Sequence, residues 1–111
     1  MMKILIAEDE IYARKSMKKQ IMELDFGREF HILEAQNGEQ GLALFRQEEP
    51  DLVFTDIRMP KMDGLELLRE IKREDPEAKV IMVSAYADFE YAKSAIKFGA
   101  EGYLLKPIED A

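Results

Sequence analysis

Short apolar runs alternate along this chain with segments in which apolar residues recur every three or four positions. The apolar runs are short and almost free of charge, which is typical of strands buried on both faces of a parallel sheet. They are Lys3–Ala7, Phe30–Ala35, the run beginning Leu52–Phe54, Val80–Val83 and Gly102–Leu105. We therefore expect five strands.

The intervening segments have helical periodicity and ordinary helix stop signals. After Ile11, the residues Met17, Ile21 and Leu24 form one stripe that ends before Gly27. A second helix carries Leu42, Leu44 and Phe45 and stops at Pro50, a third runs through Leu65–Lys72 to Asp75-Pro76, and a fourth runs from Asp88 to Phe98. Strands alternating with helices through short loops predict an α/β fold with right-handed crossovers.

The fourth predicted helix is apolar on two sides, whereas a surface helix needs only one apolar face. One face carries Phe89, Ala92 and Ile96, and the nearly opposite face carries Tyr91, Ala95 and Phe98. Either neighbouring loops cover the second face, or Tyr91 and Phe98 belong to a partner-binding surface. The second interpretation is the hypothesis that a double substitution of Tyr91 and Phe98 would test.

Composition and charge restrict the function. A chain of 111 residues forms one domain, and its net charge of −7 disfavours direct binding to nucleic acid or to an anionic membrane. Cysteine is absent, which excludes disulfides and thiolate chemistry. No segment has the length of a membrane span or the pattern of a signal peptide, so we expect a cytoplasmic protein.

Candidate chemistry gathers where the predicted strands end. Glu8 and Asp9 follow the first strand, Asp56 ends the third, Ser84 the fourth and Lys106 the fifth. The carboxyl ends of parallel strands share one edge of the sheet, so these groups should converge on one crevice. Three crowded carboxylates repel one another unless a cation neutralises them, and an all-oxygen set suits Mg²⁺. Lys106 and Ser84 would bind phosphoryl oxygens while Asp56 acts as a nucleophile.

These residues closely resemble the receiver domain of two-component response regulators. The matching segments are Ile4–Glu10, Leu52–Gly64, Val83–Ala85, Gly99-Ala100 and Tyr103–Pro107, within a resemblance that extends from Lys3 to about Glu109. It implies a flavodoxin-like (CheY-like), doubly wound, five-stranded parallel sheet of order 2-1-3-4-5. It further implies that residues 1–111 form a receiver domain at the N-terminus of a longer regulator.

The resemblance also implies a role for each site residue. Asp56 would accept a phosphoryl group from a sensor histidine kinase, with Lys106 and Ser84 assisting. Asp9, Asp56 and the main-chain carbonyl of Arg58 would ligate Mg²⁺, and Glu8 would act through a water molecule. Ser84 and Tyr103 would be the switch residues that change the surface of the fourth helix and fifth strand. Glu8 stands where the family often carries Asp, which alters the water-mediated coordination slightly.

Further expectations concern partners and the end of the chain. We expect a homodimer on activation and an output that controls transcription, with no direct contact between this domain and nucleic acid. The chain stops where a fifth helix would begin, so that helix is missing or truncated. Apolar surface near the first and fifth strands and near the helix that carries Met17 and Ile21 should then be exposed.

Two other functions are compatible with parts of the pattern. A Mg²⁺-dependent phosphatase with an aspartyl phosphate intermediate usually has a second acid two residues after the nucleophile, and Arg58 at that position argues against it. A degenerate receiver that binds partners without phosphorylation is disfavoured by the complete set of acids, Ser84 and Lys106. His31 lies within a predicted strand, which favours a structural role.

Overall fold

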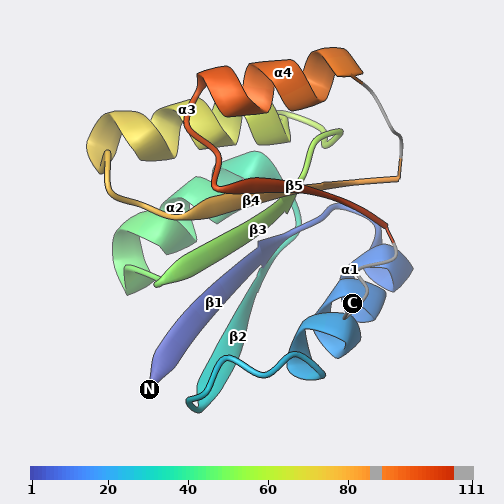
Figure 1. Ribbon diagram of the computed structural model, residues 1–111, viewed down its shortest axis with the longest axis vertical. Coiled ribbons are helices and arrows are strands. Elements are labelled where there is room, and N and C mark those ends of the chain that lie inside the picture. The colour runs from blue at the N-terminus through green and yellow to red at the C-terminus, as the bar shows by residue number, and fades with distance from the viewer. Residues whose placement is uncertain (86–88, 107–111) are drawn as a thin grey trace.

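The computed structural model describes residues 1–85 and 89–106, and five parallel strands alternate in it with four helices (Figure 1). The elements are β1 (Met2–Ala7), α1 (Ile11–Met22), β2 (Phe30–Ala35), α2 (Gly38–Glu48), β3 (Leu52–Asp56), α3 (Gly64–Glu74), β4 (Val80–Ser84), α4 (Phe89–Lys97) and β5 (Gly102–Leu105). Every strand and helix expected from the sequence is present. The predicted start of the last helix at Asp88 and the expected loss of a fifth helix concern positions outside the described residues.

The strands form one sheet in the order β2-β1-β3-β4-β5, which confirms the predicted topology. Ala7 is paired with Ala35 on one side and with Thr55 on the other, and Asp56 is paired with Val83. These registers align the carboxyl ends of the central strands at one edge of the sheet. The residues that follow each strand are therefore brought together there.

Helices cover both faces of the sheet, with α2, α3 and α4 on one face and α1 on the other (Figure 1). The larger core lies beneath α2 and α3 and includes Leu42, Phe45 and Leu68. The smaller core lies beneath α1, where Met17 and Ile21 are fully buried. Apolar surface was expected near the helix that carries these residues, but Met17 and Ile21 themselves pack against the side chains of the central strands. Leu104 and Leu105 of β5 are exposed, as expected.

The orientation of α4 also differs from the expectation. Ala95 is fully buried, and Tyr91 and Phe98 pack against the larger core. Ile96 is 73% exposed instead, and the side chain of Phe89 lies outside the described residues. Two guanidinium groups lie over the packed rings: Arg58 is 5.7 Å from the Tyr91 centroid and Arg69 is 4.8 Å from the Phe98 centroid. The face assigned to a partner is thus the one that holds α4 on the protein.

Candidate functional site

Glu8 is a carboxylate buried at the end of β1, where only 1% of the residue is exposed. Its amide donates a hydrogen bond to the carbonyl oxygen of Ala35 over 3.1 Å, which continues the pairing of β1 with β2 by one residue. Its Oε2 atom accepts a hydrogen bond of 3.3 Å from the amide of Glu10, which in turn caps α1. A buried carboxylate needs such partners, because desolvating an unpaired charge is costly.

Asp56 ends β3, and its placement depends on the loop that follows. Its Oδ1 atom accepts a hydrogen bond of 2.8 Å from the amide of Ile57. The loop then folds back so closely that a Cβ atom at Gly64 would lie 1.9 Å from the Asp56 carbonyl oxygen. Only glycine fits this approach, and Asp63 immediately before it caps α3 by accepting a hydrogen bond from the amide of Glu66.

Three carboxylates meet at this edge of the sheet. One oxygen atom from each of Glu8, Asp9 and Asp56 can be chosen so that all lie within 4.8 Å of one another. The donor set consists of oxygen atoms alone, and hard divalent cations such as Mg²⁺ prefer such donors. The residues present therefore fit a magnesium ion, as the sequence predicted.

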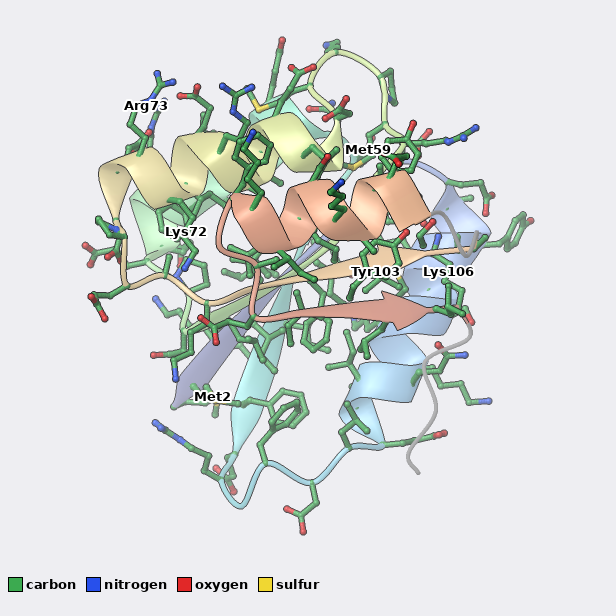
Figure 2. All side chains as sticks on the ribbon, turned by 45° about the horizontal axis from the view of Figure 1, so that its top comes forward. Met2, Met59, Lys72, Arg73, Tyr103 and Lys106 are labelled. Carbon is green, nitrogen blue, oxygen red and sulfur yellow. The ribbon has the colours of Figure 1, made fainter. Side chains whose placement is uncertain are left out.

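Lys106 connects two of these carboxylates through its ammonium group. The Nζ atom pairs with Oε1 of Glu8 and lies 3.4 Å from Oδ2 of Asp56. Lys106 follows the end of β5 (Figure 2), where its amide donates a hydrogen bond to the carbonyl oxygen of Ser84. The lysine is thereby aimed across the sheet edge at β1 and β3.

The charges in the cluster shift two pKa values upward. Burial tends to lower the pKa of the Lys106 ammonium, but the hydrogen bond to Glu8 and the attraction of Asp56 and Glu8 outweigh it and raise that pKa. The pKa of Asp9 is raised first by desolvation, and also by its hydrogen bond with Glu8 and by the charge of that residue. The raised pKa of Lys106, and the smaller contribution of Glu8 to the raised pKa of Asp9, reflect negative charge that an additional cation would relieve.

The two predicted switch residues lie on the strands beside the cluster. Ser84 is buried at the end of β4, one position after Val83, the partner of Asp56 in the register. Tyr103 lies near the middle of β5 opposite Met82, half-buried against the larger core rather than within the acid cluster. Figure 2 labels Tyr103 on β5 and Lys106 just after the end of that strand. The structure therefore brings Ser84 close to the site and places Tyr103 nearer to α4.

An open cleft of about 410 Å³ lies beside Asp9, one of the three acids. Its wall is formed by Asp9, Ile57, Arg58, Met59, Pro60, Asp63 and Tyr91. The exposed side chain of Arg58 reaches across this cleft towards α4. A larger cavity of about 560 Å³ lies between the start of β2 and the end of α1, away from the cluster. The cleft is the better candidate for a reactive site because Asp9 of the acid cluster lines it.

Arg14 was not identified from the sequence, although it contacts the cluster. It is a buried residue of α1 whose Nη1 atom donates a hydrogen bond of 3.0 Å to the main-chain oxygen of Glu8. Arg14 shares its helical face with Met17 and Ile21 at spacings of three and seven. An ionisable residue on an otherwise apolar face was the available signal.

The domain thus combines an α/β fold with an acid cluster and a lysine at the carboxyl ends of its parallel strands. Residues 4–111 match the response regulator receiver domain family, and the chain belongs to that family. It is accordingly a phosphoacceptor switch of two-component signalling rather than a conventional enzyme. The acid cluster is typical of the magnesium site of receiver domains.

Relatives with regulatory names share much of the sequence. An uncharacterised response regulatory protein of Staphylococcus epidermidis is 42% identical over 112 residues, which cover 98% of this chain and 42% of that protein. The transcriptional regulatory protein HptR of Staphylococcus aureus is 41% identical over 112 residues, which cover all of this chain and 43% of that protein. The chain therefore spans less than half the length of these two relatives, and transcription regulation occurs among its homologues.

A solved relative has been captured with a metal and a partner. The CheX–CheY–BeF₃–Mg²⁺ complex of Borrelia burgdorferi contains a chain 31% identical to this one, with a TM-score of 0.82 over 97% of this chain and 80% of that chain. That complex shows a homologue together with a protein partner and Mg²⁺.

Among the described residues of the present chain, no helix combines the length and apolar character needed to cross a bilayer.

Proposed function

We propose that Asp56 is the phosphoryl acceptor of this domain and that a sensor histidine kinase is the donor. The observation that carries the proposal is the meeting of Glu8, Asp9 and Asp56 within 4.8 Å, with the Lys106 ammonium 3.4 Å from Asp56. A cluster of that composition can bind a divalent cation, accept a phosphoryl group and neutralise the added charge. Membership of the receiver family supports the same chemistry.

The transfer is a displacement at phosphorus. A carboxylate oxygen of Asp56 forms a bond to the phosphorus atom of a phosphohistidine as the phosphorus–nitrogen bond breaks. The electron pair of the broken bond remains on the imidazole nitrogen, which then takes up a proton from water. The product is an acyl phosphate on Asp56 and a neutral histidine on the kinase. Before the transfer, Oδ1 of Asp56 accepts a hydrogen bond from the amide of Ile57 and Oδ2 lies 3.4 Å from the Lys106 ammonium, so both carboxylate oxygens are held in place.

The surrounding residues prepare the site for this charge. Asp9, Asp56 and the Arg58 carbonyl would hold Mg²⁺ directly, and Glu8 would hold it through water. Bound Mg²⁺ supplies neutralisation of the phosphoryl oxygens. The Lys106 ammonium provides a second positive charge, and its pairing with Glu8 keeps it at the edge of the site. The Ser84 hydroxyl is the proposed hydrogen-bond donor to the phosphoryl group.

The output follows from movement on β4 and β5. We infer that Ser84 shifts towards the phosphoryl group and that Tyr103, now half-buried, turns further inward. Because Tyr103 and α4 border the same core, this changes the surface formed by α4 and β5. The changed surface would promote homodimerisation and act on an output that controls transcription.

The wider setting of the domain is inferred from its relatives. We propose that residues 1–111 are the N-terminal receiver domain of a longer cytoplasmic regulator. The support is that the matching part covers 42% and 43% of two regulators from Staphylococcus species, one of them named as transcriptional. With a net charge of −7, the receiver itself would contact the kinase and a second copy rather than DNA.

The decisive experiment is the intact mass of the protein after incubation with acetyl phosphate. We expect a gain of one phosphoryl group that requires Mg²⁺ and is absent from Asp56→Asn. Asp51→Asn, at an exposed position at the opposite end of β3, is the matched control and should gain the group normally. A folded wild-type protein that gains no mass, or an Asp56→Asn variant that still does, would refute the proposed acceptor.

A further inference from the structure

Arg14 is a charged side chain in a buried position, where desolvating the charge costs folding free energy. Only 8% of the residue is exposed, and it lies on the face of α1 that packs on the sheet. Burying a guanidinium group destabilises a protein unless its donors are well satisfied. Its contacts should therefore explain why an apolar residue does not occupy this position.

The guanidinium group joins three elements. Nη1 donates a hydrogen bond of 3.0 Å to the main-chain oxygen of Glu8, just after β1. Nε donates a hydrogen bond of 3.2 Å to Oε1 of Glu34 on β2. Arg14 itself belongs to the first turns of α1, and its amide donates to the carbonyl oxygen of Glu10. One rigid planar group thus ties the loop between β1 and α1 to β2.

The contact with Glu8 completes a restraint on that residue from both sides. The Glu8 amide is held by the carbonyl oxygen of Ala35, and the Glu8 carbonyl is held by Arg14. The Glu8 carbonyl and the Asp9 amide belong to the same planar peptide unit. Its orientation determines the direction in which both neighbouring carboxylates leave the main chain.

We propose that Arg14 is a positioning residue for the divalent-cation site, holding the Glu8–Asp9 peptide so that both carboxylates face Asp56. This inference rests on the proposed function, because it concerns the ion that assists phosphorylation. Arg14 contacts the main chain of an acid in the cluster, leaving both Glu8 side-chain oxygens to other groups. Removing a residue that orients metal ligands typically lowers metal affinity about 10- to 100-fold.

A purely structural explanation predicts something different. If Arg14 only fastened α1 to β2 through Glu34, any residue that makes the same ion pair would matter in the same way. Lys18 makes such a pair, with Nζ 3.3 Å from Oε2 of Glu34, and this contact leaves Glu8 untouched. Lys18→Met is therefore the matched control, and Glu34→Gln removes the charge of the shared partner.

The test measures cation affinity without phosphorylation. Mn²⁺, which also binds oxygen donors, is titrated into wild type, Arg14→Met, Lys18→Met and Glu34→Gln while free ion is counted by electron paramagnetic resonance. Mg²⁺ competition then confirms the site. We expect Arg14→Met to bind at least about tenfold more weakly than wild type, with the two controls close to wild type. Urea unfolding identifies the conditions in which every variant is folded.

Each outcome decides a separate point. Equal affinity in Arg14→Met and wild type, or an equal loss in the two controls, would overturn the role of Arg14 while leaving the Asp56 chemistry intact. A wild-type protein without cation affinity would overturn the metal site itself. If Arg14→Met does not fold, Arg14→Lys serves instead, because one ammonium group cannot reproduce the two-pronged contact. Wild-type affinity in that variant would also refute the proposal.

Discussion

Replacing Lys106 with methionine should destabilise the domain and at the same time strengthen its binding of Mg²⁺. The substitution keeps most of the aliphatic side chain and removes the ammonium group that lies between Glu8 and Asp56. Glu8 then remains as a buried carboxylate at 1% exposure without its cationic partner. In exchange, the three acids lose a fixed charge that competes with a divalent ion.

The size of the effect can be worked out from the geometry. At 3.4 Å and an effective dielectric constant of about 20, the attraction between Lys106 and Asp56 is about 5 kcal/mol before desolvation is subtracted. Breaking a buried pair by removing one partner costs about 3–5 kcal/mol. Since 20% of the Lys106 side chain is exposed, we expect a loss near the lower figure, about 3 kcal/mol. That is a large part of the stability of a small domain.

The assay is urea unfolding of wild type and Lys106→Met, each without and with saturating Mg²⁺. Because a ligand stabilises the folded state according to its affinity, Mg²⁺ should recover part of the loss, and the gain should be larger in the variant. Lys15→Met, an exposed substitution on α1, controls for the loss of one positive charge. Equal stability of Lys106→Met and wild type without Mg²⁺, or a smaller gain from Mg²⁺ in the variant, would refute the reasoning.

Three further predictions test other parts of the structure. Because the pKa of Asp9 is raised, ionising it costs folding free energy as the pH rises through and above its ordinary value of 3.8, so Asp9→Asn should be more stable than wild type at neutral pH without divalent ions. Thermal unfolding across pH checks this, and a variant less stable than wild type at neutral pH would contradict it. Gly64→Ala should lose about 3 kcal/mol or more in urea unfolding, because its Cβ atom would collide with the Asp56 carbonyl oxygen; unchanged stability would show that the loop approaches Asp56 less closely. On α4, Ile96→Ser should change stability by no more than about 0.5 kcal/mol, whereas Phe98→Ser should cost about 2 kcal/mol. The reverse order would mean that the helix packs through its other face.

Ionised Lys106 stabilises the folded domain, whereas ionised Asp9 destabilises it. The pKa of the ammonium is raised above its ordinary value of 10.5, so its stabilising effect is fully present below that pH. It is lost as the pH rises through the higher value in the folded protein. In the neutral range, Lys106 therefore keeps its charge and the pairing with Glu8 persists.

The strands could be predicted because the relevant signals are local, and their order was implied by the resemblance to receiver domains. Continuous apolar runs such as Val80–Val83 can be satisfied only where both faces of a strand are covered. Short connections with right-handed crossovers then bring the carboxyl ends to one edge, which is how Glu8, Asp9, Asp56 and Lys106 were grouped. The structure confirms that these four residues meet, and the proposed chemistry builds on that meeting.

The buried face of α4 was harder to predict from the sequence. In α4 both candidate faces carry apolar residues, so the sequence pattern alone does not distinguish them. The packed face was decided by neighbouring elements, because Arg58 and Arg69 place their guanidinium groups over Tyr91 and Phe98. Ile96 was left exposed although it is the more apolar choice. Such an outcome depends on residues far away in the sequence.

The sequence by itself determined the fold class and the set of residues at the reactive edge, because these follow from hydrophobic periodicity, chain connectivity and residue chemistry. The strand order was implied by the resemblance to receiver domains. Only the tertiary structure decided how those residues are held. The burial of Glu8 against Lys106, the approach of Gly64 to Asp56 and the contact of Arg14 with the Glu8 carbonyl all join different elements. Their distances are set by the packing of helices on the sheet, which no local pattern records.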